Sequence, residues 1–114
     1  MTMKLISNND LVAKLDSGDD FKLVMVLGER AFRNKHLPGS MYISHPSEIT
    51  ELLDPTDEII LYCSAPSSPA SKQVYQFMAR EGYGDVRRYA GGITDWEENG
   101  LPLEGEWAEP QLLN

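Results

Sequence analysis

Two short and almost continuously apolar runs limit most strongly what this chain can fold into. Residues 21–27 (FKLVMVL) and 59–63 (IILYC) are too short for buried helices, carry β-branched residues and are bounded by turn-forming residues. Such runs are typical of strands buried on both faces, which occur in parallel sheets covered by helices. The segments between them have helical features, so we predict an α/β fold with a parallel sheet flanked by helices.

Local signals predict where the other elements begin and end. Ser7 and Asp10 have the spacing of a helix N-cap with an acidic partner, which predicts a helix over about 8–17 that ends near Gly18. Apolar spacing and turn residues further predict brief strands at 41–44 and 86–89, and helices at 46–53, 70–82 and 93–98.

The length and charge of the chain restrict its organisation and its partners. A length of 114 residues suits a single domain, with a core that we place at about 4–103 and a C-terminal tail at 104–114. The 18 acidic and 10 basic residues give a formal charge of −8, which disfavours nucleic acid and anionic membranes because phosphate contacts need clustered Lys and Arg. No basic residue follows Arg88, so a basic protein partner could use the acidic C-terminal part.

The composition also bears on location and cofactors. The first residues lack the basic and apolar segments of a secretory signal, and no apolar run approaches the roughly 20 residues of a membrane span, so we expect a cytoplasmic protein. Cys63 is the single cysteine, which excludes an internal disulfide. With only His36 and His45 beside it, the usual zinc ligand pairs are missing. We expect neither a metal nor a cofactor.

Cys63 ends the second apolar run, and this position carries the functional hypothesis. In open parallel sheets, reactive groups gather beyond the carboxyl ends of the strands, where helix N-termini point. Amide dipoles there favour a thiolate, so Cys63 could act as a nucleophile without a histidine base. The alternative is a buried apolar cysteine that happens to end a strand. The loop that would surround the sulfur is longer than a strand-to-helix connection requires, and it comprises Ser64, Ala65, Pro66, Ser67, Ser68, Pro69, Ala70 and Ser71.

Several segments in their order and spacing make the chain resemble a single-domain rhodanese, a family of sulfurtransferases. They are His36-Leu-Pro-Gly-Ser40, the strand that ends at Cys63, and Tyr89-Ala-Gly-Gly-Ile-Thr-Asp-Trp96. The resemblance implies a five-stranded, mainly parallel sheet flanked by helices on both faces, with Cys63 at the base of a cradle-shaped loop. It also implies covalent catalysis, in which Cys63 takes a sulfane sulfur from a small donor or a protein persulfide and passes it to cyanide or a thiol.

The loop departs from the family pattern. The arginine that the family has five residues after the cysteine is replaced here by Ser68, and Pro66 and Pro69 each remove a backbone N–H. We therefore expect a neutral or protein-bound persulfide to be a better donor than thiosulfate, and Lys72 is the nearest candidate in sequence for the lost charge. Two alternatives remain: a catalytically silent module that binds a protein partner, and a phosphatase, which would need an arginine where Pro69 stands.

Other polar and aromatic residues have structural interpretations. Alternation along the last predicted strand places Arg87 and Arg88 on opposite faces, so at most one of them can reach the loop. We expect His36 to make a structural hydrogen bond in its turn. Tyr62 and Trp96 are expected to pack in the core.

Overall fold

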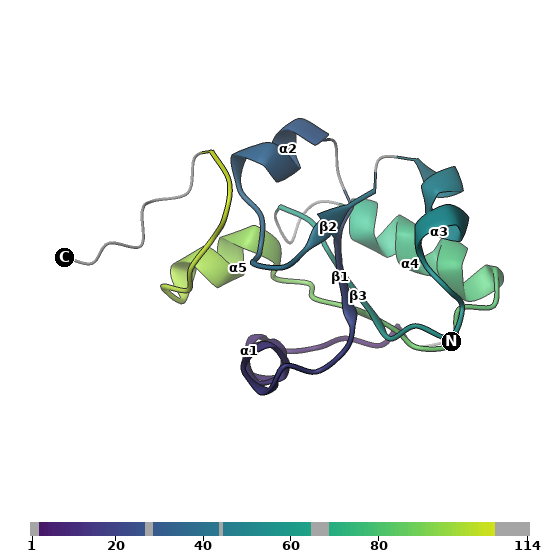
Figure 1. The fold of residues 1–114 in the computed structure, drawn as a ribbon, viewed down its shortest axis with the longest axis horizontal. Coiled ribbons are helices and arrows are strands. Elements are labelled where there is room, and N and C mark those ends of the chain that lie inside the picture. Colours follow the sequence, from purple (N-terminus) through teal and green to yellow (C-terminus); the bar gives the residue numbers. More distant parts are fainter. Residues whose placement is uncertain (1–2, 27–28, 44, 65–68, 107–114) are drawn as a thin grey trace.

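The computed structural model describes residues 3–26, 29–43, 45–64 and 69–106. Within these ranges the sheet has four strands, β1 (Lys22–Met25), β2 (Met41–Tyr42), β3 (Ile59–Tyr62) and β4 (Val86–Arg88), in the order β2-β1-β3-β4. All neighbouring strands are parallel, and helical crossovers connect them (Figure 1). The predicted α/β class with a parallel sheet is confirmed.

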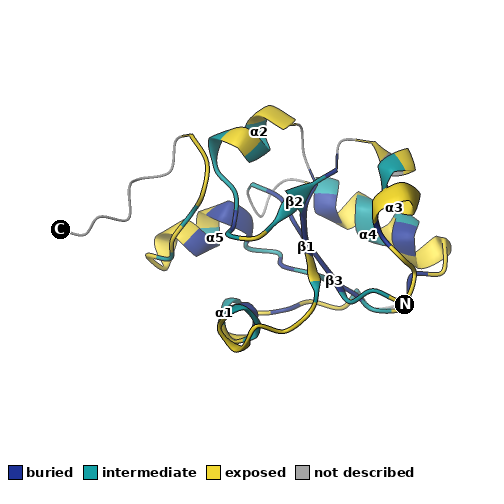
Figure 2. Cartoon of the chain, viewed as in Figure 1, coloured by how far each residue is buried: buried dark blue, intermediate teal, exposed yellow. Residues whose placement is uncertain are grey.

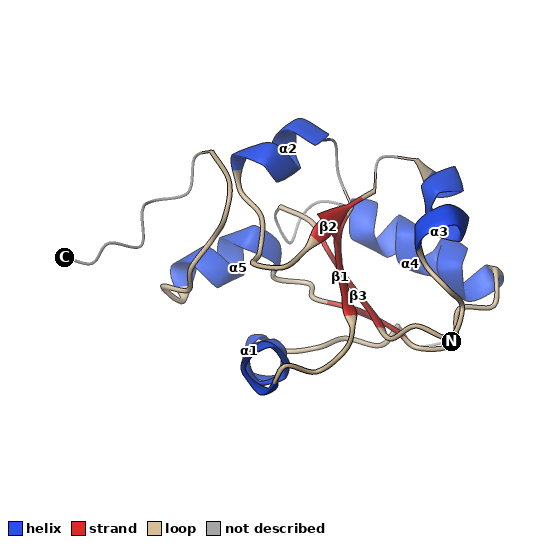
Figure 3. Ribbon diagram, viewed as in Figure 1, coloured by secondary structure: helices blue, strands red, loops and turns tan. Residues whose placement is uncertain are grey.

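Helices cover both faces of this sheet. The described residues contain α1 (Asn8–Ser17), α2 (Glu29–Asn34), α3 (Pro46–Leu52), α4 (Ala70–Arg80) and α5 (Gly92–Glu98). Helices α3 and α4 lie on one side of the sheet, and α1 and α5 lie on the other (Figure 3). No helix among the described residues is long and apolar enough to cross a membrane.

Alternation along the central strand divides the core into two layers. On β3, Ile59 and Leu61 pack with α3 and α4, and we call this layer the α4 face. Ile60 and Tyr62 pack with α1 and α5, and we call this layer the α5 face. All four side chains are buried, and β3 is drawn in the dark blue of buried residues in Figure 2. Because side chains alternate along a strand, Cys63 returns to the α4 face.

Helix α1 begins and ends where its sequence signals predict. Ser7 is the N-cap, and its Oγ accepts a hydrogen bond from the Asp10 amide at 3.1 Å. Gly18 ends the helix with φ at 72°, in the left-handed region that favours glycine. Leu11 is fully buried on the α5 face together with Ile6. The cap and this apolar pair fix the helix against the sheet.

The five-stranded sheet that the resemblance implied is not formed in full. Leu5 makes an isolated parallel bridge with Arg88, in which the Arg88 amide donates to the Lys4 carbonyl at 2.9 Å and the Ile6 amide donates to the Arg88 carbonyl at 3.1 Å. One bridge is not a strand, so the described sheet has four strands rather than five. The physical reason is that the chain turns into the α1 cap at Ser7, which leaves few extended residues to pair.

Helix α2 has no counterpart among the predicted elements. None of its residues is buried, and only Ala31 and Phe32 pack partly against the α5 face. An ion pair between Glu29 and Arg33, one turn apart, supports the helix. The segment is too short and too weakly apolar to show a helical period in the sequence.

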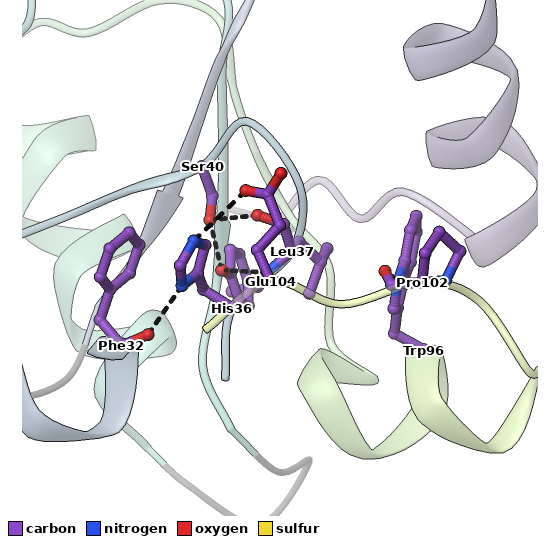
Figure 4. A network of polar contacts seen from close by, with 8 residues as sticks. Phe32, His36, Leu37, Ser40, Trp96, Pro102 and Glu104 are labelled. Atoms are coloured by element: carbon purple, nitrogen blue, oxygen red, sulfur yellow. Dashed lines mark hydrogen bonds and ion pairs between the residues drawn. The ribbon is translucent and has the colours of Figure 1, made fainter. Parts of the chain in front are cut away.

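The segment after α5 is held by aromatic and histidine contacts (Figure 4). Trp96 is buried, and its Nε1 donates to the Pro102 carbonyl at 2.7 Å. Glu104 forms an antiparallel bridge with His36. The His36 ring stacks on Phe32 with centroids 3.9 Å apart, and its Nδ1 lies 2.7 Å from the Phe32 carbonyl oxygen. The structural roles predicted for His36 and Trp96 are confirmed.

Candidate active site at the carboxyl end of strand β3

Cys63 directly follows β3 and lies at the carboxyl edge of the sheet. The Val26 amide donates to the Tyr62 carbonyl at 2.9 Å, so the chain after β1 still runs beside β3 at this point. The Cys63 side chain is only 1% exposed. It belongs to the α4-face cluster, so the sulfur is enclosed between the sheet and α4.

The backbone at Cys63 is fixed by the first residues of α5. The Ile93 amide donates to the Cys63 carbonyl at 3.1 Å, and the Thr94 amide donates to the Ser64 carbonyl at 3.1 Å. The Thr94 hydroxyl donates to the same Ser64 carbonyl at 3.0 Å. These three donors hold the point where the strand becomes the loop.

This close approach of α5 requires a glycine at position 92. Gly92 has φ at 63°, and a Cβ on it would lie 2.1 Å from the Cys63 carbonyl oxygen. Any side chain would therefore both strain the backbone and push α5 away from the cysteine. The second glycine of the Gly-Gly pair thus has a backbone role.

Ser71 is a described residue that lies against the sulfur. It lies in the first turn of α4 and is fully buried. Its Oγ lies 3.4 Å from Cys63 Sγ, which is within hydrogen-bond distance for sulfur. On its other side, Arg88 Nε donates to Ser71 Oγ at 2.8 Å. Cys63, Ser71 and Arg88 therefore form a continuous polar chain from the sulfur to a guanidinium.

The register of β4 explains why Arg88, and not Arg87, joins this chain. Arg88 is paired with Leu61 and Arg87 with Ile60. Leu61 belongs to the α4 face, and so does Val86, two residues before Arg88. The sequence already allowed one of the two arginines to reach the loop. The apolar Val86 was the signal that could have identified Arg88 as that one.

The other predicted site residues are distributed as follows. Residues 65–68, which include Pro66 and Ser68, lie outside the described residues, so the predicted ring of loop amides stays a prediction. Ser64 and Ala70 are half-buried. Pro69 is exposed and is the N-cap of α4. Lys72 is exposed on the first turn of α4 and stays an untested candidate for the charge.

Tyr62, next to the cysteine, belongs to a separate network on the α5 face. Its hydroxyl accepts a hydrogen bond from the Leu37 amide at 3.0 Å and lies 2.7 Å from Ser40 Oγ. Ser40 Oγ in turn donates to the Leu37 carbonyl at 2.7 Å (Figure 4). Burial raises the pKa of Tyr62 to about 12. Its packing role is confirmed, because this network ties the turn at 37–40 to β3.

Metal-binding side chains do not cluster in the described part of the chain. Within residues 3–26, 29–43, 45–64 and 69–106, no group of three His, Cys, Asp or Glu side chains could hold a metal ion. The described side chains linked to Cys63 offer a hydroxyl and a guanidinium beside the sulfur.

Comparisons of the sequence with known proteins agree with this geometry. The rhodanese-like domain family matches residues 7–99. A protein named sulfurtransferase from Allochromatium vinosum is 26% identical over 102 residues, which cover 86% of this chain and 92% of that protein.

Comparisons of the structure extend to nearly the whole chain. The BH2092 protein from Bacillus halodurans has a TM-score of 0.83 at 21% identity, with 97% of this chain and 85% of that chain covered. The rhodanese-like domain of the Alr3790 protein from Anabaena has a TM-score of 0.82 at 19% identity, with 99% and 91% covered. At these identities the likeness concerns the fold.

Proposed function

The chain belongs to the rhodanese-like domain family, and from that premise we propose that it is a sulfurtransferase that moves sulfane sulfur through a persulfide on Cys63. The observation that carries the proposal is the polar chain at the carboxyl edge of the sheet. A serine hydroxyl lies 3.4 Å from the sulfur of the single cysteine, and a guanidinium nitrogen lies 2.8 Å behind that hydroxyl. Both groups suit a sulfur that carries negative charge.

The proposed reaction has two half-reactions that exchange one S–S bond for another. In the first, the Cys63 thiolate attacks the outer sulfur of a donor persulfide. The new bond forms at Cys63 Sγ, the donor's S–S bond breaks, and the electron pair leaves on the donor thiolate, which takes up a proton. In the second, an acceptor thiolate attacks the outer sulfur of the Cys63 persulfide, and Cys63 leaves as a thiolate. Neither half-reaction needs an oxidant or a reductant.

We propose a neutral or protein-bound persulfide as the donor rather than thiosulfate. Ser68 stands where the family has a loop arginine, and the protein has a formal charge of −8. Both features are unfavourable for a dianion. The 1% exposure of Cys63 further favours a donor that presents its terminal sulfur on a narrow group.

One observation favours a second function, a partner-binding module without chemistry. The sulfur is buried among apolar side chains, as expected for a packing cysteine. In this case the exposed carboxylates of Glu97, Glu98 and Glu106 would form a surface for a basic protein partner.

Mass spectrometry of the intact protein separates the two functions. After incubation with cysteine persulfide, we expect wild type to gain one sulfur atom and Cys63→Ala to gain none. Thiosulfate at the same concentration should load the protein more slowly. Transfer of the bound sulfur to a thiol acceptor would then complete the cycle. A wild-type protein that gains no sulfur from either donor would support the binding module instead.

A further inference from the structure

Hydrogen bonds hold the backbone of Arg88, and they fix the position from which its side chain extends. Its amide donates to the Lys4 carbonyl at 2.9 Å, and its carbonyl accepts from the Ile6 amide at 3.1 Å. The residue lies at the end of β4, paired with Leu61 of β3. The side chain is half-buried and points to the α4 face, where its Nε reaches Ser71.

The direction of the hydrogen bonds follows from what each group can do. A guanidinium only donates, so Ser71 Oγ must be the acceptor of the bond from Arg88. Ser71 is fully buried, and its Oγ lies 3.4 Å from Cys63 Sγ. Ser71 keeps its own hydrogen to donate, and a Cys63 thiolate, which can only accept, would accept that hydrogen bond. A hydrogen bond donated to sulfur stabilises the thiolate, and also a persulfide anion, relative to the protonated forms.

Of the described ionisable groups near the sulfur, Arg88 is the one that we expect to act on Cys63. Among the described residues, no carboxylate forms an ion pair with Arg88, because the ion pairs there involve Lys14, Arg33, Lys35 and His36. Tyr83 and Tyr75 are the other titratable groups on the α4 face. The Tyr83 hydroxyl donates to the Leu53 carbonyl at 3.0 Å, and the Tyr75 hydroxyl accepts from the Lys4 amide at 3.0 Å. Lys72 is exposed to solvent, which screens its charge.

From this geometry we infer that Arg88 is a positioning residue for Cys63, which acts through Ser71 and supplies from strand β4 the positive charge that the loop lacks. The inference rests on the proposed function of Cys63 as a sulfur carrier. It deepens that function by assigning the thiolate stabilisation to a residue outside the active-site loop. Arg88 orients the Ser71 hydroxyl, and the hydroxyl contacts the reacting atom.

The test is a pH titration of the Cys63 thiolate by its ultraviolet absorbance, with Cys63→Ala as the blank. The absorbance measurement does not require a reagent to reach the sulfur. We expect Arg88→Gln to lower the thiolate fraction about tenfold at pH values below the wild-type midpoint, because a hydrogen bond to a charged group is lost. Ser71→Ala should give a similar loss. The double variant should lose little more than Ser71→Ala alone, because Arg88 acts through that hydroxyl.

Two further variants make the test specific. Arg87→Gln removes the same charge from the neighbouring position on the opposite face of β4, and its titration should match wild type. Arg88→Lys keeps the charge and should recover part of the thiolate fraction, without the fixed Nε geometry. Thermal unfolding of each variant verifies that the fold is retained.

The outcomes distinguish this inference from the proposed function. If Arg88→Gln and Arg87→Gln both titrate like wild type, the inference is overturned even when wild type accepts sulfur. If Arg88→Gln shifts the titration but wild type gains no sulfur from a persulfide, the inference holds and the sulfurtransferase proposal fails. A shift in Arg88→Gln with unchanged Ser71→Ala would overturn the route through the serine.

Discussion

Tyr62 and Cys63 are neighbours in sequence whose side chains enter opposite faces of the sheet, and each has a serine beside its polar atom. On the α5 face, Ser40 Oγ lies 2.7 Å from the Tyr62 hydroxyl. On the α4 face, Ser71 Oγ lies 3.4 Å from Cys63 Sγ. The two sites look alike up to this point, and they differ in the group that lies behind each serine.

The group behind Ser40 is a carbonyl, which can only accept. Ser40 donates its hydrogen to the Leu37 carbonyl at 2.7 Å, so it acts as an acceptor toward Tyr62. The Tyr62 hydroxyl accepts from the Leu37 amide and donates to Ser40. Burial is the main cause that raises the pKa of Tyr62 to about 12, and the hydrogen bonds with Ser40 and with the Leu37 amide oppose that rise.

The group behind Ser71 is a guanidinium, which can only donate. Arg88 occupies one lone pair of Ser71 Oγ, and in the proposed role the serine donates its hydrogen to a Cys63 thiolate. A serine beside a polar atom thus has its hydrogen-bond direction set by the third group in the chain, which is a carbonyl at Ser40 and a guanidinium at Ser71.

We expect the largest loss of stability at the contact of α5 with the backbone of Cys63. A Cβ at position 92 would lie 2.1 Å from the Cys63 carbonyl oxygen, and φ is 63° there. We expect Gly92→Ala to lower the free energy of unfolding by about 3 kcal/mol or more, measured by urea denaturation. Gly100 has φ at 71° with no atom within 4 Å of a Cβ, so Gly100→Ala should cost only about 1 kcal/mol. Equal losses would show that the contact with Cys63 does not restrict position 92.

The next effect tests the α5 face alone. Tyr62→Phe leaves the buried Leu37 amide without its acceptor, so we expect a loss of about 1–3 kcal/mol in the free energy of unfolding at pH 7. The Cys63 thiolate titration should not change, because the two networks lie on opposite faces. Ser40→Ala is the matched control for Ser71→Ala, and it too should leave that titration unchanged. A shift caused by either variant would mean that the faces are coupled.

The same tyrosine predicts a specific dependence of stability on pH. Its pKa is about 12 in the folded protein and about 10 in an unfolded chain. The folded state holds the proton more tightly, so this contribution is fully present below pH 10 and is lost as the pH rises to 12. Between these values, wild type should lose about 2–3 kcal/mol more than Tyr62→Phe in urea denaturation. Parallel losses in the two proteins would contradict the assigned pKa.

The smallest effect sharpens the assignment of the charge on the α4 face. Lys72 is the nearest basic residue in sequence to the loop, but it is exposed. We expect Lys72→Gln to change the thiolate fraction by less than about twofold, because solvent and salt screen an exposed charge. The titration that tests Arg88→Gln measures this as well. If Lys72→Gln has the larger effect, the charge comes from α4 and not from β4.

Sequence reasoning succeeded where a local pattern is sufficient and failed where it is not. The cap at Ser7 and the left-handed Gly18 are local features, and they fixed the ends of α1. Helix α2 has no buried residue and no apolar period, so its sequence carried no signal. The fifth strand was inferred by resemblance, and it is reduced to the Leu5 bridge because the N-cap of α1, Ser7, follows two residues later.

The candidate site shows the same division. The apolar run that ends at Cys63 was sufficient to place the sulfur at the carboxyl edge of a parallel sheet. Alternation limited the loop-facing arginine to one of two. The contact of Arg88 with Ser71 joins residues from β4 and α4 that are 17 positions apart in the sequence. No local sequence pattern predicts a contact over such a separation.

By itself, the sequence determined that this protein is a helix-covered parallel sheet with its one thiol beyond the end of a central strand, because side-chain period, caps and breakers act within a few residues. Only the tertiary structure decided which charge stands behind that thiol. Strand register and the docking of α4 bring distant side chains together, and they depend on packing across the whole core rather than on neighbours in the chain.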